Sequence, residues 1–237
     1  MKKITILILM VFGFFTNANA FDGVKGFNLG VSLSAGLFEA DGAKEEFKGA
    51  HVGGASPGNV SKSSADNGDG AKGAFGIGSI FAEAQITDMF AVGVDYVPHT
   101  LGTDTAENQQ TDKTSSDTST NRSNTVQVDF EDMTTVYATM AFPNVDGLYV
   151  KAGYMEVDVI TNEKLGTGGS YANTSLDGYM VGLGFNHDKG DGMFVRVEAS
   201  YMDLDGATLT NGDDSTKSIT ADGVTGYGAK LSVGRSF

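Results

Sequence analysis

The side chains best suited to acid–base or nucleophilic chemistry are few. The 237 residues contain three histidines, His51, His99 and His187, and no cysteine. Of the three, only His99 has a hydroxyl neighbour, Thr100. A hydrolase or acyltransferase needs a base, a hydroxyl nucleophile and an orienting carboxylate within hydrogen-bond reach, and the sequence offers nothing beyond this pair. We expect no catalytic residues, and keep an outer-leaflet lipid-modifying enzyme acting through His99 as a second alternative function.

Metal, cofactor and nucleic-acid chemistry are also poorly supported. The Asp/Asn/Gly clusters at residues 66–70 and 203–214 could offer oxygen ligands to Ca²⁺, but neither has EF-hand spacing, and these residue types are ordinary turn formers. The glycines near Gly168 precede no helix that would supply an anion site. A formal net charge of −14 disfavours a nucleic-acid partner. We therefore expect no metal and no cofactor.

A further set of ionisable residues contains three acids and three bases. The segments that carry them alternate between polar and apolar residues, and these six occupy polar positions. The set comprises Glu83, Asp95, Lys151, Arg196, Glu198 and Lys230. If these segments close into a small barrel, the six side chains face a lumen only wide enough for side chains, where buried ions must pair. We interpret them as a lumenal charge network; the alternative is the gate of a small diffusion pore.

The N-terminus indicates export. Lys2 and Lys3 precede an apolar stretch at residues 4–15, followed by Ala18-Asn19-Ala20. The stretch is too short to span a bilayer as a helix, and the small residues suit cleavage after Ala20. We predict a cleaved signal peptide at residues 1–20 and a single barrel domain at residues 21–237.

Period-two alternation dominates the mature chain and predicts an all-β fold. The alternating segments are residues 27–37, 73–86, 90–97, 126–142, 148–161, 176–185, 193–204 and 227–237. Their connections alternate strictly between long, polar loops and short turns. Outer-membrane barrels have even strand numbers, short periplasmic turns and long extracellular loops. The sequence therefore predicts an antiparallel, up-and-down, eight-stranded transmembrane β-barrel.

The apolar faces carry aromatic residues sorted by type. Phenylalanines fall at the short-turn ends of the strands: Phe27, Phe90, Phe142, Phe185 and Phe237. Tyrosines fall toward the long loops: Tyr96, Tyr154, Tyr179, Tyr201 and Tyr227. We predict two aromatic girdles, about 23 Å apart along the membrane normal for strands tilted by roughly 45°, close to the ~25 Å expected of an apolar band.

One strand, residues 126–142, shows an unusually long alternation. Val126, Val128 and Phe130 share a parity with Val136, Ala138, Met140 and Phe142. We expect all of them on one face of the strand.

The last strand resembles that of small eight-stranded outer-membrane barrels of the OmpA membrane-domain, OmpX and opacity-like type. Tyr227, Leu231, Val233 and the terminal Phe237 are similar to the signal that the barrel assembly machinery reads in these families, whereas Arg235 departs from it. The resemblance implies a monomer in the bacterial outer membrane. It also implies outer-membrane lipid and lipopolysaccharide as neighbours, an unidentified extracellular ligand at the loops, and a structural or surface-interaction role; a porin-like diffusion pore is the first alternative.

Overall fold

The computed structural model describes residues 23–40, 43–47, 71–114, 118–166, 169–213, 215 and 217–237. The predicted signal peptide, His51 and the cluster at residues 66–70 lie outside these ranges. Within them, no helix has the length and apolarity needed to cross a membrane.

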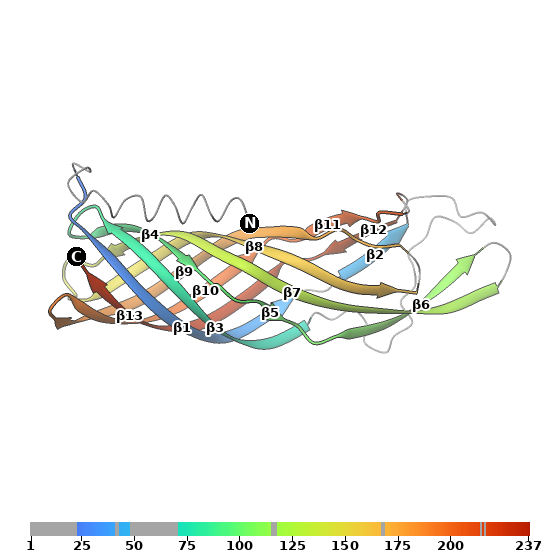
Figure 1. The fold of residues 1–237 in the computed structure, drawn as a ribbon, viewed down its shortest axis with the longest axis horizontal. Helices are drawn as coiled ribbons and strands as arrows, with labels where there is room; N and C mark the ends of the chain where they lie inside the picture. Colours follow the sequence, from blue (N-terminus) through green and yellow to red (C-terminus); the bar gives the residue numbers. More distant parts are fainter. Residues whose placement is uncertain are drawn as a thin grey trace.

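Eight strands close into one antiparallel barrel (Figure 1). They are β1 (Gly26–Ala40), β3 (Ala71–Gln85), β4 (Phe90–Tyr96), β7 (Thr118–Ala141), β8 (Leu148–Leu165), β9 (Thr174–Gly190), β10 (Met193–Leu204) and β13 (Val224–Ser236). Each pairs with the next in the order β4-β3-β1-β13-β10-β9-β8-β7, and β4 pairs with β7 to complete the circle. The predicted eight-stranded, up-and-down barrel is confirmed.

The first and last barrel strands pair along their full length. Val31 lies opposite Val233, and the register continues from Asn28 with Ser236 to Ala40 with Val224. At the end, the backbone N–H of Phe237 donates to the carbonyl of Phe27 at 2.8 Å, and that of Phe27 to Phe237 at 3.2 Å. This pairing leaves no strand edge open between the two ends of the barrel sequence, as a lipid environment requires.

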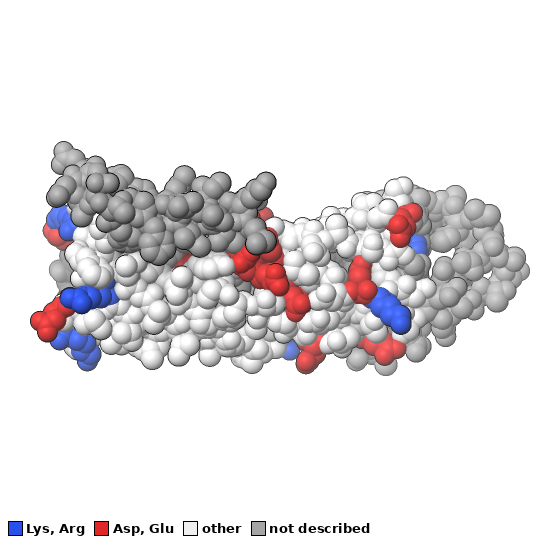
Figure 2. Space-filling view, viewed as in Figure 1, with Lys and Arg blue, Asp and Glu red and all other residues white. Residues whose placement is uncertain are grey.

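The outer surface near the short turns is a belt of apolar side chains. In the part of the chain whose side chains are described, the exposed large hydrophobic residues all lie on the half of the barrel nearer the short turns. Leu33, at 70% exposure, and Leu37, at 65%, are examples. The space-filling view shows an uncharged band here, bounded by charged side chains on both sides (Figure 2). Such a belt is unfavourable in water and suits the hydrocarbon core of a bilayer.

The connections at the other end, which we call the loop end, contain more strand than expected. The added strands are β2 (Ala43–Phe47), β5 (Leu101–Gly102), β6 (Ala106–Thr114), β11 (Ala207–Thr210) and β12 (Lys217–Ala221). β6 forms a hairpin with the first part of β7, while β11, β12 and β2 form a separate three-stranded sheet. We expected only long, polar loops between the predicted strands at residues 90–97 and 126–142, and between those at 193–204 and 227–237. This expectation was wrong, because threonine-rich segments favour strands when their backbone groups can pair. We call the loop-end part of the molecule, which comprises these added strands and the adjoining ends of the barrel strands, the extension.

A β-bulge in β7 corrects the predicted face of residues 126–130. The register with β8 shifts between Glu131 and Thr134, and Asp132 has a left-handed φ of 53°. One extra residue reverses the alternation. Val136 and Met140 therefore point outward, as expected, whereas Val128 and Phe130 pack against the buried interior.

The turn between β9 and β10 is shorter than predicted. We expected residues 186–192 to turn, but β9 continues to Gly190 and places His187 opposite Val195. Asp191 and Gly192 form the connection with φ angles of 52° and 75°. Positive φ at both central residues matches a two-residue hairpin turn, for which Asp-Gly is a preferred sequence.

Candidate functional site

The barrel interior near the short turns holds the six ionisable residues singled out from the sequence. They form three ion pairs across the lumen, each joining residues from different strands. Arg196 pairs with Glu83 at 2.8 Å, Lys230 with Asp95 at 2.8 Å, and Lys151 with Glu198 at 3.3 Å. Four of the six are almost fully buried, Glu83 at 2% exposure and Lys151 at 6% being examples. The three pairs together carry no net charge.

Glu83 is the most extensively bonded carboxylate of the network. Both terminal nitrogens of Arg196 donate hydrogen bonds to it, Nη1 to Oε2 at 2.9 Å and Nη2 to Oε1 at 2.8 Å. Asn28 Nδ2 donates to Oε1 at 2.8 Å, and the Tyr137 hydroxyl donates to Oε2 at 3.2 Å. A buried carboxylate is stable only when its oxygens are satisfied in this way.

Aromatic rings link the ion pairs into one network. The Tyr149 hydroxyl donates to Glu198 Oε2 at 3.0 Å, and Lys151 Nζ lies 4.1 Å from the centre of the Tyr137 ring. The guanidinium of Arg196 lies 4.5 Å from the Phe194 ring centre. These contacts fill the space between the charges and compensate for the loss of water around them.

Lumenal glycines provide the room for these rings. At six glycines an added Cβ would lie only 2.3–2.6 Å from a ring atom on a neighbouring strand. The pairs are Gly30 with Phe81, Gly36 with Phe75, Gly73 with Phe38, Gly93 with Tyr137, Gly184 with Tyr149 and Gly234 with Phe194. A ring can lie flat on the barrel wall only where its neighbour has no side chain, so these glycines are steric sockets for the lumenal aromatics.

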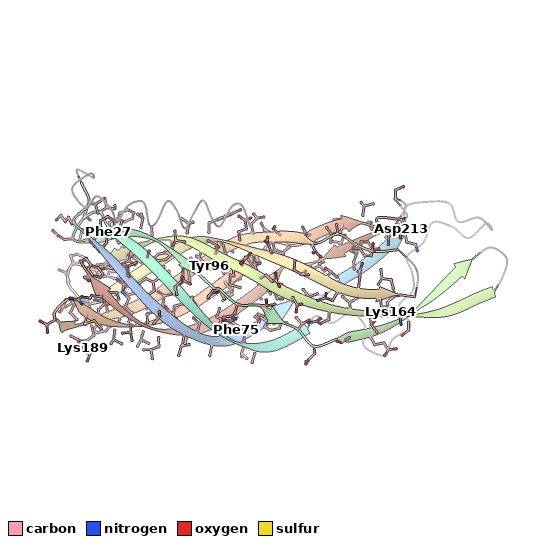
Figure 3. The ribbon with its side chains drawn as sticks, viewed as in Figure 1. Phe27, Phe75, Tyr96, Lys164, Lys189 and Asp213 are labelled. Atoms are coloured by element: carbon pink, nitrogen blue, oxygen red, sulfur yellow. The ribbon has the colours of Figure 1, made fainter. Side chains whose placement is uncertain are left out.

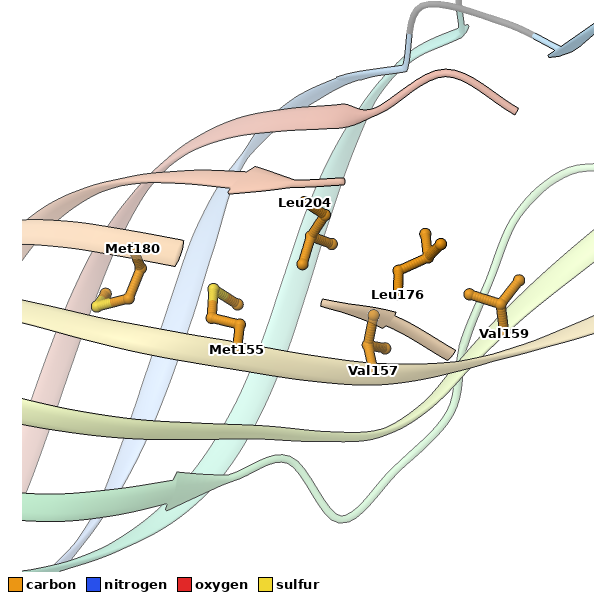
Figure 4. Packing of buried hydrophobic residues seen from close by; sticks show 6 residues of the cluster. All are labelled: Met155, Val157, Val159, Leu176, Met180 and Leu204. Carbon is orange, nitrogen blue, oxygen red and sulfur yellow. The ribbon is translucent and has the colours of Figure 1, made fainter. Parts of the chain in front are cut away.

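Toward the loop end the interior becomes apolar. The buried cluster comprises Met155, Val157, Val159, Leu176, Met180 and Leu204, contributed by β8, β9 and β10 (Figure 4). Val128, Phe130 and Met133 of β7 pack against it. The interior is thus divided into a charged layer near the short turns and an apolar layer at the base of the extension.

The predicted girdle residues lie on the outer surface, exposed or half-buried. In the stick view Phe27 lies near the end that carries Lys189, and Tyr96 lies between that end and Lys164 and Asp213 of the extension (Figure 3). Several tyrosine hydroxyls donate to aspartates of the adjoining strand: Tyr96 to Asp132 at 2.7 Å, Tyr154 to Asp177 at 2.8 Å and Tyr179 to Asp203 at 2.9 Å. Polar partners on the outside place these hydroxyls at the boundary between the apolar belt and water.

The C-terminal residues assigned to the assembly signal also face outward. Tyr227, Leu231, Val233 and Phe237 are all exposed. Arg235, the departure from the expected pattern, is exposed as well, and its guanidinium lies 5.6 Å from the centre of the Phe237 ring. The arginine therefore sits at the short-turn rim, where its charge can reach water.

His99 and Thr100 have partners other than each other. The backbone N–H of Gly78 donates to His99 Nε2 at 2.9 Å, and Thr100 Oγ1 donates to Glu131 Oε1 at 3.1 Å. His187 lies on β9 at the short-turn end. His99 and Thr100 thus do not hydrogen-bond to each other as the enzyme alternative would require. Among the described residues there is no group of three metal-binding side chains.

The barrel wall is discontinuous beside His99. β4 pairs with β3 only from Ile80 to Gln85, although β3 begins at Ala71. After Tyr96 the chain follows β7 instead, with Val97 N–H donating to the Met133 carbonyl at 2.9 Å. Among the described residues, no strand covers this edge of β3 at residues 71–79. We call the junction between this edge and residues 97–102 the seam.

Sequence reasoning missed Asn28, Tyr137 and Tyr149 as members of the charge network. All three lie on the inward parity of their strands, so the signal was present, but only charged residues were considered. The apolar layer also had a signal: on β8 the apolar residues change parity from Val150 and Tyr154 to Met155 and Val157. A strand that leaves lipid and enters a water-covered fold should make this change.

Comparisons with known proteins give only distant likenesses. No family model matches the sequence, and neither does any curated protein. Similar solved structures include the outer membrane protein OprG from Pseudomonas aeruginosa, with 12% identity, 90% of this chain and 96% of that chain covered, and a TM-score of 0.45. AlkL in lipid bilayers has 13% identity, coverages of 92% and 93%, and a TM-score of 0.45. Neisserial surface protein A has 14% identity, with 91% of this chain and 100% of that chain covered, and a TM-score of 0.42. None of these likenesses bears on which residues act.

Proposed function

We propose that this protein is an integral barrel of the bacterial outer membrane with a structural or surface-interaction role, in which the extension is presented outside the cell. The observation that supports this most directly is the apolar belt beneath a β-structured extension. The belt matches lipid, whereas outward residues of the extension, such as Gln127, Asp129 and Asn162, hydrogen-bond to one another in a polar surface. Surface loops on a rigid scaffold are the usual place for recognition.

The charge network favours a closed lumen and argues against a diffusion pore. Three ion pairs and the aromatic rings around them fill the layer near the short turns. Opening a path there would separate buried charges, which is costly. Planar bilayers containing the purified protein should show no stable single-channel steps, in the wild type and in Lys151→Met alike. Steady conductance that changes in Lys151→Met would support the pore instead.

The orientation can be tested with single cysteines, because the chain has none of its own. Thr210→Cys places a thiol at the exposed end of β11 in the extension, and Asp146→Cys places one in the exposed short turn after β7. A membrane-impermeant maleimide added to intact cells should label Thr210→Cys and spare Asp146→Cys. Both variants should react equally in lysed cells. Labelling of only the Asp146 variant in intact cells would contradict the proposal.

A second candidate function is binding or passage of small apolar molecules at the loop end. Two observations favour it: the apolar layer contains the flexible side chains of Met155 and Met180, and the seam interrupts the wall at the base of the extension. Methyl-labelled methionine signals can test this in lipid nanodiscs titrated with n-octane. Shifts of Met155 and Met180 beyond those of the lipid-facing Met140 would support an interior site, and equal shifts would indicate partitioning into lipid.

A further inference from the structure

The seam is joined by a hydrogen bond that depends on a titratable side chain. Gly78 of β3 has its N–H on the edge that β4 leaves uncovered, and this N–H donates to His99 Nε2 at 2.9 Å. His99 belongs to the segment that has already turned to follow β7, where Thr103 N–H donates to the Val128 carbonyl at 2.8 Å. The bond therefore connects two parts of the wall that have no strand pairing with each other at this level.

Only neutral histidine can make this bond. An Nε2 atom that accepts a hydrogen bond must carry a lone pair, so the ring proton is on Nδ1. Protonation places a hydrogen on Nε2, directly facing the Gly78 N–H. The acceptor is then lost and two donors oppose each other.

The charged groups around His99 favour its movement away from β3 once it is protonated. On β7, Glu131 and Asp132 hold the neighbours of His99, accepting hydrogen bonds from Thr100 and Tyr96. On the other side, residues 73–82 of β3 and 31–38 of β1 contain no ionisable side chain. Asp95 of β4 points into the lumen, paired with Lys230, and Asp104 lies further along the segment of His99. An imidazolium is attracted to the carboxylates of β7 and finds no counter-charge on residues 73–82 of β3.

We propose that His99 is a pH-sensitive latch of the seam. In its neutral form it ties the uncovered edge of β3 to the segment after β4. Protonation releases this edge and turns the ring toward Glu131 and Asp132. Histidine suits a switch of this kind because protonation turns its accepting ring nitrogen into a donor. The latch is a property of the barrel wall and does not depend on what the extension binds.

The amide signal of Gly78 reports the latch directly. We expect its proton resonance, measured by NMR on the full mature chain in nanodiscs, to move sigmoidally toward the non-bonded position as pH falls from 8 to 5. His99→Gln keeps an acceptor that does not titrate, so Gly78 should remain at the bonded position throughout. The same movement in His99→Gln, or none in the wild type, would overturn the proposal.

Hydrogen exchange at constant pH provides a second readout that does not rely on titration. At pH 7.5, His99→Phe should raise the exchange of residues 76–79 about fivefold, the effect of losing one modest hydrogen bond, and His99→Gln should stay near the wild type. Amides of the paired β1–β13 region, such as Val31, provide the internal reference. Equal protection of residues 76–79 in all three proteins would show that His99 does not hold the seam.

Discussion

Arg196 on β10 and Glu83 on β3 are 113 positions apart in the sequence, yet they form two hydrogen bonds of 2.8 and 2.9 Å across the lumen. The two strands are not neighbours in the barrel, since β1 and β13 lie between them. The pair therefore ties opposite parts of the wall together through the interior, a link that strand pairing cannot make.

Breaking this pair should be strongly destabilising. Arg196→Met leaves the Glu83 carboxylate buried without its main partner, which we expect to cost about 3–5 kcal/mol in the free energy of unfolding from lipid vesicles by urea. The double variant Glu83→Gln, Arg196→Met should lose less, because no unpaired charge remains. As a control, Lys72→Met removes the exposed pair with Glu39 and should have no measurable effect. Equal losses in the single and double variants would argue against a charge-pairing role.

The glycine sockets predict a sharp difference between two alanine substitutions. Gly184→Ala would place a methyl group 2.3 Å from the Tyr149 ring, whose hydroxyl is held by Glu198, so the ring cannot yield freely. Overpacking of this kind costs about 1–3 kcal/mol. Gly76→Ala has open space, with no heavy atom within 4 Å, and should leave unfolding unchanged or slightly improved. Urea unfolding of both variants would decide, and equal stability would refute the socket interpretation.

The bulge in β7 makes a prediction about register. Deleting Asp132 would remove the extra residue and with it the bulge; Val128 and Phe130 would then lie an odd number of residues from Val136 and would keep their inward face. Hydrogen exchange of residues 124–131 should therefore stay near the wild type, and heat-modifiable gel migration of the barrel should persist. Tyr96→Phe is the matched control, because it removes the hydrogen bond to Asp132 without changing the number of residues. A strong rise in exchange in the deletion variant, but not in Tyr96→Phe, would show that the extra residue itself maintains the extension and would contradict this prediction.

The terminal residue should affect assembly more than stability. By the resemblance noted in the sequence, Phe237→Ala weakens the signal read during insertion, so less protein should reach the outer membrane in its heat-modifiable form. Once inserted, the variant keeps the backbone bonds to Phe27 and should unfold near the wild-type urea concentration. Met193→Ala, another exposed apolar residue near this rim, provides the control. A normal yield of folded Phe237→Ala would contradict the assigned signal.

Much of the barrel could be predicted because lipid imposes a simple rule on each strand. Period-two alternation located all eight barrel strands, and the six charged residues chosen from the inward parity form the three lumenal ion pairs of the described residues. Which acid meets which base could not be predicted, since it depends on strand stagger around the barrel and on side-chain length. Glu83 meets Arg196 across two intervening strands, a relation with no local signal.

The extension was harder to predict because lipid does not constrain it. Its strands carry Thr, Ser, Asn and Gln, a composition shared by strands and by solvated loops. The bulge at Asp132 escaped notice for a different reason. The alternation from Val126 to Phe142 is unbroken in the sequence, and only the backbone reveals that the two halves of β7 face opposite ways.

This reversal sets the depth at which the barrel can sit. Below Asp132, β7 offers apolar side chains to its surroundings; above it, the apolar side chains are inside and Asp129 and Gln127 are outside. Sliding the molecule inward along the membrane normal would carry these polar groups into hydrocarbon, and sliding it outward would expose Val136 and Met140 to water. A single additional residue thus fixes the boundary between the apolar belt and water, and the seam and His99 lie at this boundary.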